Sequence, residues 1–423
     1  MKRLLNPPRY NPFFRYRGGC LWCENTPVEK IAAKVGTPAY VYSRAGIEAA
    51  FQNYRRAFAS VPHAICYAVK ANSNLSVLRV LARLGSHFDI VSGGELFRLS
   101  QAGVPGDRMV FSGVGKSREE IRDALQAGIL LFNVESEEEL ALLAEEASRL
   151  RRPAPAALRI NPDVRIESHP HIATGAHRHK FGVDWEEARR LYHAYRNHPA
   201  VRWRGISSHI GSQVLRVEPF RLAVRRMARF VRELQWEGIE FSYFDCGGGL
   251  GVRYISEQPP SLRSYARALA RAVKPTGCQL LLEPGRSIVG PAGILLTRVL
   301  YTKTTRGKRF IIVDAGMNDF IRPALYGARH PITLEKDARA GQGTIRADIV
   351  GPVCESGDSF LHDWRMPAVN PGDLLVLWGA GAYGFVQASN YNSRPRPPEV
   401  LVEGSRFRVI RNREAREDLI RGE

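Results

Sequence analysis

The sequence predicts an α/β fold in which a (β/α)8 barrel of the TIM type is followed by a second, all-β domain of barrel or sandwich type. Two observations predict the barrel: eight short apolar runs lie between residues 60 and 290, and each of the first seven precedes a segment with apolar residues at helical spacing. A third observation predicts the β domain, because β-type runs separated by Gly, Pro and Asp begin at about residue 288.

The eight predicted strands share a short apolar run bounded by polar or turn-forming residues. They cover residues 63–69, 88–91, 109–112, 130–134, 157–160, 205–210, 243–246 and 279–282. The segments between them show helical spacing, as in 185–195 and 219–234. Four glycines stand where a glycine typically closes a helix: Gly85, Gly103, Gly128 and Gly238. Eight βα repeats fit a closed barrel better than an open sheet.

The domain organisation follows from where these patterns change. The run 37–43 (TPAYVYS) has a strand pattern, and we expect it to join the β-type runs that lie far along the chain. We therefore divide the chain into four parts: an N-terminal extension (1–36), a strand joining the C-terminal β domain (37–43), the barrel (44–287) and the C-terminal β domain (288–423).

Composition excludes several functional classes. The 423 residues include 61 Lys and Arg against 42 Asp and Glu, a net charge of +19. Because the basic residues are spread along amphipathic segments such as 220–232, we expect no nucleic-acid partner. No apolar run is long enough to cross a bilayer, and the N-terminus lacks the apolar stretch of a secretory signal. We therefore expect a cytoplasmic protein without a membrane partner.

The six cysteines are scattered and do not resemble a disulfide framework. Cys20 and Cys23 have the CxxC spacing of metal sites, but no second pair or His cluster accompanies them, so we expect no metal. Cys354 stands beside Glu355 and Asp358. It is either a thiol that can act as an acid or an inert buried cysteine.

The predicted strand ends carry unusual chemistry, since in a barrel they face one common mouth. Lys70 ends an apolar strand, where an amine loses hydration, its pKa falls, and it can form a Schiff base with an aldehyde. Three consecutive glycines, Gly247 to Gly249, follow another strand, and Gly285-Arg286 follows the next. Backbone N–H groups and a guanidinium suit a phosphate, so two such loops predict a phosphorylated cofactor.

Two further mouth residues have more than one interpretation. Glu283 ends the apolar strand QLLL, where a carboxylate needs a partner: either a buried ion pair or a protonated ring nitrogen. His209 is either a core histidine with satisfied hydrogen bonds or a ring that stacks on a flat cofactor.

Taken in order, the motifs YAVKAN, DIVSGGEL, HIGSQ, CGGGLG, EPGR, DAGMNDFIRPALY, GPVCESGD and GAYG are similar to those of a known family. Over about residues 26 to 410 the chain resembles the fold-type III pyridoxal-phosphate decarboxylases, most closely those that act on meso-2,6-diaminopimelate. The resemblance implies a pyridoxal 5'-phosphate cofactor carried on Lys70. It also implies a homodimer in which the β domain of one subunit completes the site of the other.

The resemblance also implies roles for individual residues. His209 would stack on the pyridine ring and Glu283 would pair with its nitrogen. The residues implied to hold the phosphate or otherwise contact the cofactor are Ser212, Gly247, Gly248, Gly249, Gly285, Arg286 and Tyr383. Those implied to bind substrate are Arg286, Arg322, Tyr326, Glu355 and Tyr383. Cys354 and Glu355 would come from the partner subunit, and Cys354 would act as a catalytic acid together with Lys70 and His209.

These roles predict decarboxylation of meso-2,6-diaminopimelate to L-lysine and CO2, the last step of lysine biosynthesis. The distal end of this substrate carries a carboxylate and an ammonium, which suit Arg322 with Tyr326 and Glu355 respectively. An acidic residue at position 283 favours decarboxylation over racemisation. Two alternatives are a decarboxylase of ornithine or arginine, and a non-catalytic pyridoxal-phosphate-binding or regulatory protein.

Overall fold

The structure is a computed structural model that describes residues 12–164, 180–337 and 343–423. Residues 1–11 of the predicted N-terminal extension lie outside the described residues. The chain forms two compact units. The β unit comprises Met1–Ala50, Arg253–Glu257 and Arg286–Glu423, and the barrel unit comprises Phe51–Val252 and Gln258–Gly285.

Eight parallel strands close into a ring in the barrel unit. They are β5 (His63–Ala68), β6 (His87–Ile90), β7 (Met109–Phe111), β8 (Leu131–Val134), β9 (Ala154–Arg159), β10 (Val201–Ser207), β11 (Tyr243–Asp245) and β12 (Gln279–Leu282). The ring closes where β12 pairs with β5, with Leu281 opposite Ala64. Small and branched side chains such as Cys66, Val110 and Ala157 fill its interior. The predicted fold class is therefore confirmed.

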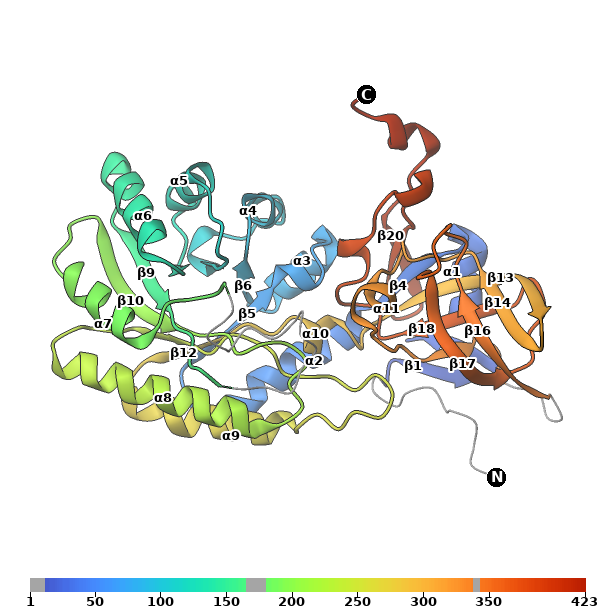
Figure 1. Cartoon of the computed structure of the whole chain (residues 1–423), viewed down its shortest axis with the longest axis horizontal. Coiled ribbons are helices and arrows are strands. Elements are labelled where there is room, and N and C mark those ends of the chain that lie inside the picture. Colours follow the sequence, from blue (N-terminus) through green and yellow to red (C-terminus); the bar gives the residue numbers. More distant parts are fainter. Residues whose placement is uncertain (1–11, 165–179, 338–342) are drawn as a thin grey trace. The chain divides into compact units, whose positions relative to one another are not determined.

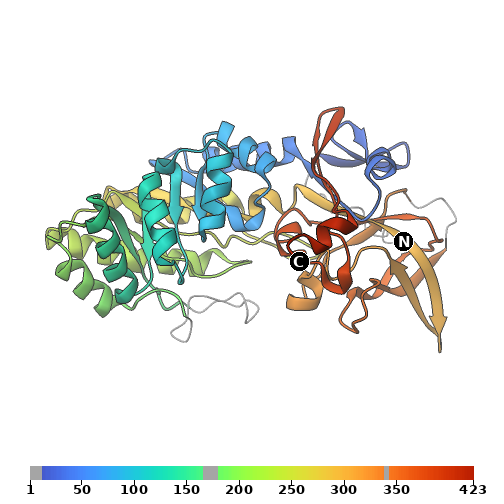
Figure 2. The ribbon, with the colours of Figure 1, turned by 90° about the horizontal axis from the view of Figure 1, so that it is seen from above.

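Helices cover the outside of this ring, with α4 to α6 on one side of the strands and α8 and α9 on the other (Figures 1 and 2). They are α3 (Leu75–Arg83), α4 (Gly93–Gln101), α5 (Arg118–Ala127), α6 (Glu137–Leu150), α7 (Trp185–Ala194), α8 (Val217–Trp236) and α9 (Leu262–Val273).

Local sequence signals begin and end these helices. In six of the seven helices the N-cap side chain accepts a backbone N–H from the first turn; these N-caps are Asn74, Ser92, Ser117, Ser136, Asp184 and Ser261. At the other end, Gly128 has a φ of +67° and Gly238 a φ of +82°, a left-handed backbone that glycine adopts without strain. These caps place each helix start directly after the loop that leaves the preceding strand.

The β unit is built on a sheet that joins distant parts of the chain. Its strands are β4 (Ala39–Ser43), β13 (Gly293–Thr305), β14 (Lys308–Val313), β15 (Ile332–Leu334), β16 (Thr344–Val350), β17 (Ser359–Pro367), β18 (Leu374–Trp378), β19 (Glu399–Glu403) and β20 (Arg406–Arg411). Strand β4 lies between β13, to which it is antiparallel, and β19, to which it is parallel. The TPAYVYS strand thus pairs with strands more than 240 positions away in the sequence.

Smaller elements complete the β unit. Strands β1 (Phe14–Arg17), β2 (Cys20–Cys23) and β3 (Thr26–Pro27) form a separate sheet, followed by α1 (Val28–Val35). Helix α2 (Arg44–Ala57) runs from the β unit into the barrel unit, and α10 (Arg286–Val289) and α11 (Arg322–Tyr326) are short. None of the helices described is long and apolar enough to cross a membrane.

The two cysteines of the CxxC motif, Cys20 and Cys23, lie in different surroundings. Cys23 is fully buried in the apolar core of the β unit. The thiol of Cys20 lies within 4.8 Å of carboxylate oxygens of Glu29 and Glu335, and Cys23 does not contribute to that group. The two thiols therefore do not act as one chelating pair.

Candidate active site

Lys70 lies in a single 3-10 turn, Val69–Ala71, directly after β5. Its amine forms an ion pair with the carboxylate of Asp89 at the end of β6. The Asp89 side chain is fully buried, and its second oxygen, Oδ1, has no hydrogen-bond partner among the described residues. The carboxylate of Asp89 thus positions the amine of Lys70 at the carboxyl ends of β5 and β6.

Two more buried carboxyl groups, Asp245 and Glu283, end the neighbouring strands β11 and β12. Burial raises the pKa of Glu283 well above its ordinary value, and the charges of Asp245 and Asp89 raise it further. Burial likewise raises the pKa of Asp245, although hydrogen bonds from Gly247 and Asn133 oppose this. Glu283 therefore keeps its proton to a higher pH than an exposed glutamate does.

Asp245 is held by its own set of donors. Asn133 Nδ2 donates to its Oδ2 at 2.8 Å, and the backbone N–H of Gly247 donates to its Oδ1 at 2.9 Å. Asn133 also donates to Ser112 Oγ at 3.1 Å, and Ser112 in turn donates to Glu283 Oε1 at 3.4 Å. These hydrogen bonds connect Asp245 through Asn133 and Ser112 to Glu283 and fix the position of its carboxyl group.

His209 is present as a neutral ring. Its Nδ1 accepts the backbone N–H of Gly248 at 3.1 Å, which leaves the ring proton on Nε2. Burial lowers the pKa of His209 well below 6.5, and the cationic groups of Arg159 and Lys70 lower it further. The 4.0 Å approach of Nδ1 to Glu283 Oε2 is therefore not an ion pair. An oriented, uncharged ring is suited to stacking on a flat cofactor.

This neutrality predicts a pH effect on stability. As the pH falls below 6.5, unfolded chains protonate His209 and folded ones do not, so the free energy of unfolding decreases. Replacing His209 by glutamine should reduce that dependence by up to about 1.4 kcal/mol per pH unit. Urea unfolding of both proteins over the pH unit below 6.5 measures the two slopes; equal slopes would show that His209 titrates normally.

The glycine triplet is required by close backbone approaches. A Cβ on Gly248 would lie 2.2 Å from the carbonyl oxygen of Glu283, and one on Gly249 would lie 2.2 Å from that of Gly211. Gly247 and Gly249 also have left-handed φ values of +64° and +97°. The N–H groups of Gly247 and Gly248 already bind Asp245 and His209. Within the triplet, only Gly249 keeps an N–H with no acceptor among the described residues.

The remaining predicted phosphate residues lie in loops next to the triplet. Val214 and Leu250 form a bridge that ties the loop carrying Ser212 to the triplet loop. A Cβ on Gly285 would lie 2.8 Å from the Cβ of Ala71, so Gly285 packs directly against the turn that carries Lys70. The barrel unit thus brings together Lys70, His209, Glu283 and the glycine loops.

Replacing Gly248 by alanine should damage this arrangement without adding any charge. Because its Cβ would meet the backbone of Glu283, the strand end must shift, and we expect a loss of roughly 1–3 kcal/mol in stability and at least tenfold weaker cofactor binding. Gly115→Ala is the matched control, since no atom lies within 4 Å of its added Cβ. Equal cofactor affinity in both variants, measured by titration of the apoprotein, would contradict this role.

The β unit contains a second cluster built on two buried guanidinium groups. Arg286 Nη1 donates to the hydroxyl of Tyr254 at 2.9 Å, and its guanidinium carbon lies 4.8 Å from the ring centre of Tyr383. Arg322 lies 5.9 Å from the same ring and 5.7 Å from that of Tyr326. Tyr383 has a φ of 54°, which is uncommon for a bulky residue and marks a constrained position.

Arg322 is oriented by His330. Arg322 Nε donates to His330 Nε2 at 3.2 Å, so the ring proton of His330 is on Nδ1, 2.9 Å from the carbonyl oxygen of Trp378. Burial, together with the charge of Arg322, lowers the pKa of His330 well below 6.5. No carboxylate pairs with Arg322 within the described residues. Since an unpaired buried charge is costly, the cluster is built to receive an anion.

The residues predicted to come from a partner subunit lie in a loop after β16. Cys354 is exposed, and its backbone N–H donates to Asn392 Oδ1 at 3.0 Å. The carboxylate of Glu355 accepts the hydroxyl of Tyr391, and no hydrogen bond or ion pair between described residues joins it to Arg322. Asp358 has a structural role, since it accepts the N–H groups of Val353 and Met317 at 2.7 Å each.

Sequence reasoning did not single out four residues of these clusters: Asp89, Asp245, Tyr254 and His330. The two aspartates had a usable signal, because each is a carboxylate within an apolar strand that ends at the barrel mouth. Tyr254 and His330 had none, since only tertiary structure brings them to Arg286 and Arg322.

The barrel cluster fits a flat cofactor that carries an aldehyde, a ring nitrogen and a phosphate. Lys70 offers the amine, Glu283 a carboxyl group for the nitrogen, and His209 a neutral ring. The glycine loop packs its backbone directly against the strand ends, and Asp89 Oδ1, at the end of β6, lacks a hydrogen-bond partner among the described residues. Comparisons with known proteins agree. Residues 44–290 match the family "Pyridoxal-dependent decarboxylase, pyridoxal binding domain", so the predicted cofactor, pyridoxal phosphate, is confirmed.

Similar curated proteins and solved structures show to which group within this family the chain belongs. A diaminopimelate decarboxylase from Pseudomonas aeruginosa is 49% identical over 97% of this chain and 98% of its own length. The crystal structure of diaminopimelate decarboxylase from Helicobacter pylori complexed with L-lysine has a TM-score of 0.90 and 44% identity, and covers 93% of this chain and 98% of that one. An M. jannaschii diaminopimelate decarboxylase in co-complex with L-lysine has a TM-score of 0.92 and 38% identity, with 97% of each chain covered. The chain therefore belongs to the diaminopimelate decarboxylases, within the pyridoxal-dependent decarboxylase family.

Proposed function

We propose that this chain removes the carboxyl group from one amino-acid head of meso-2,6-diaminopimelate, releasing CO2 and L-lysine as the last step of lysine biosynthesis. The activity is that of a pyridoxal-phosphate-dependent carboxy-lyase. The observation that carries the substrate assignment is Arg322, a buried guanidinium with tyrosine rings around it and no carboxylate partner among the described residues.

The barrel residues bind and orient the cofactor. Pyridoxal phosphate, when bound, supplies an electron-withdrawing ring that accepts the electron pair left behind by CO2. Lys70 binds it covalently, His209 packs on its ring, and Glu283 holds a proton at the ring nitrogen. The high pKa of Glu283 suits this task, because burial and its acidic neighbours keep its proton available.

The phosphate is held by residues of the loops that follow the strands of the barrel. We assign this role to Ser212, the N–H of Gly249, and the Gly285-Arg286 turn. Gly247 and Gly248 act indirectly, because their N–H groups bind Asp245 and His209 and hold these side chains in place. This division refines the role expected for the triplet as a whole.

The β-unit residues bind the substrate. Arg322 takes the distal carboxylate in a bidentate pair, and the Tyr326 hydroxyl, one turn further along α11, adds a hydrogen bond. Arg286 and Tyr383 contact the cofactor and the substrate carboxylate that lies nearer to the cofactor. Glu355 receives the distal ammonium.

We further propose a cytoplasmic homodimer in which Cys354 and Glu355 act in the partner's site. The support is their exposure on a loop of the β unit: Cys354 is open to solvent, as an acid serving another subunit must be before assembly. Cys354 returns a proton to the Cα carbanion after CO2 leaves.

Cys354→Ala should reduce kcat by about 10²–10⁴-fold and change KM little, because the thiol acts in proton transfer and not in binding. Mixing Cys354→Ala with Lys70→Ala should restore part of the activity through hybrid dimers, since each hybrid contains one intact site. Cys20→Ala is the control and should keep full activity. Persistent inactivity of the mixture, with subunit exchange verified by mass spectrometry, would refute the shared site.

The activity itself is tested with purified protein and pyridoxal phosphate. Incubation with meso-diaminopimelate should release CO2 and lysine in equal amounts, identified by mass. A protein that shows the absorbance of the bound cofactor but forms no product from meso-diaminopimelate, ornithine or arginine would be the non-catalytic alternative.

A further inference from the structure

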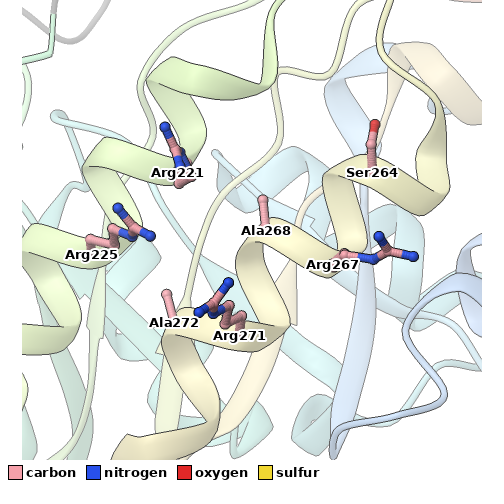
Figure 3. A pocket seen from close by; sticks show the side chains of 7 residues that line it. All are labelled: Arg221, Arg225, Ser264, Arg267, Ala268, Arg271 and Ala272. Atoms are coloured by element: carbon pink, nitrogen blue, oxygen red, sulfur yellow. The ribbon is translucent and has the colours of Figure 1, made fainter.

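Helices α8 and α9 enclose a groove on the outside of the barrel that the proposed chemistry does not use. Its volume is about 350 Å³, and α8 and α9 supply its whole lining (Figure 3). The lining residues are Arg221, Arg225, Ser264, Arg267, Ala268, Arg271 and Ala272. The proposed site lies instead at the strand ends of the barrel, so the groove belongs to a separate surface of the same unit.

The groove is strongly basic because four of its lining residues are arginines and none is acidic. Arg221 pairs with Glu218 at 2.5 Å. Arg225, Arg267 and Arg271 are exposed and have no carboxylate partner among the described residues. Elsewhere on α8, by contrast, Arg229 pairs with Glu233 at 2.9 Å. Within the groove, three of the four arginines thus have no carboxylate partner among the described residues.

The four arginines come in two pairs, one on each helix. Arg221 and Arg225 are four residues apart on α8, and Arg267 and Arg271 are four apart on α9, so each pair lies on one helix face. Figure 3 shows the α8 arginines on one side of the groove and the α9 arginines on the other. Guanidinium charges that line one groove repel each other, and an anion between them would relieve that repulsion.

The shape favours a small ligand over a long one. Between the arginines, the groove is lined by the small side chains of Ala268 and Ala272, which leave room for a ligand. The Ser264 hydroxyl lies at one end of the groove. A volume of about 350 Å³ lies in the range of sites for small molecules. Guanidinium forks match phosphate oxygens in bidentate pairs, and two pairs of forks suit two or more linked phosphates.

We propose that the α8–α9 groove binds a small anion with a di- or triphosphate group. The proposal is independent of the decarboxylase chemistry, because none of the groove residues has a role in the proposed active site. The ligand is either an inorganic polyphosphate or the phosphate chain of a nucleotide, and both present the same linked phosphates to the arginines.

Isothermal titration of the holoenzyme at physiological ionic strength, with inorganic tripolyphosphate and then ATP, tests the proposal. The covalently bound cofactor occupies the phosphate loops of the barrel mouth during the titration. We expect one tripolyphosphate per subunit, and at least tenfold weaker binding in the double variant Arg225→Gln/Arg267→Gln. Binding of ATP with similar or greater affinity would indicate a nucleotide, and binding of tripolyphosphate alone an inorganic ligand.

Arg232→Gln/Arg263→Gln is the matched control. It removes one charge from each of the same helices, but neither residue lines the groove. Its affinity should stay within twofold of the wild type. Equal weakening in both double variants would mean general attraction to a basic protein and would overturn the proposal. Absence of binding, or tighter groove-dependent binding of single-stranded DNA than of tripolyphosphate, would overturn it as well.

Discussion

Lys70→Ala is expected to abolish the visible absorbance of the purified protein and to lower kcat by at least about 10³-fold. The lysine is the cofactor attachment point in the proposed site, and its loss also removes a group that can transfer protons, which alone is worth about 10²–10⁴-fold. The buried carboxylate of Asp89 loses its cation at the same time. Absorbance spectra and steady-state kinetics measure both effects.

A second variant separates the chemistry of Lys70 from its structural contact. Lys70→Arg keeps a cation for Asp89 but cannot form a Schiff base, so it should fold normally and still lack the absorbance. Lys274→Ala, an exposed lysine on the barrel surface, is the control and should behave like the wild type. A borohydride-reduced pyridoxyl adduct that maps to a lysine other than Lys70 would refute the assignment.

Arg322→Ala is expected to lower kcat/KM for meso-diaminopimelate by about 30-fold or more. Truncating one partner of a buried charge pair typically costs about 2–5 kcal/mol, and here the other partner is the distal carboxylate. Cofactor absorbance should persist, because Arg322 is not among the residues proposed to hold the cofactor. Kinetics with saturating pyridoxal phosphate measure the loss.

Two variants test the reason for that loss. Arg322→Lys keeps the charge but not the guanidinium fork that donates to both His330 and a carboxylate, so it should recover only part of the activity. Arg329→Ala removes an exposed arginine nearby in the sequence and should have no effect. An active Arg322→Ala protein would show that the distal carboxylate binds elsewhere.

Periodicity and turn residues were enough to predict the barrel, because each strand is a short apolar run and each helix carries local end signals. Ser117 and Glu120 form a capping box at the start of α5, and Gly128 ends the same helix with a left-handed φ. Closure of the ring was inferred only from the number of repeats, since the β12–β5 pairing joins strands far apart in the sequence. The strand ends then located Lys70 and Glu283.

Contacts across the fold could not be predicted in the same way. The partner of Lys70 is Asp89, 19 residues later, and only the parallel register of β5 and β6 brings the two together. The tautomer of His209 depends on the N–H of Gly248, 39 residues away. These interactions depend on strand register and loop geometry, which no local pattern of residues encodes.

The proposed role of Arg322 is to select a substrate with a distal carboxylate. Its guanidinium would face the cationic tails of ornithine and arginine with like charge in a desolvated site, which costs several kcal/mol. The most direct measurement is kcat/KM of the wild-type protein for meso-diaminopimelate, ornithine and arginine under one set of conditions. We predict a value for meso-diaminopimelate at least about 10²-fold above the other two. A higher kcat/KM for ornithine or arginine would contradict this role of Arg322.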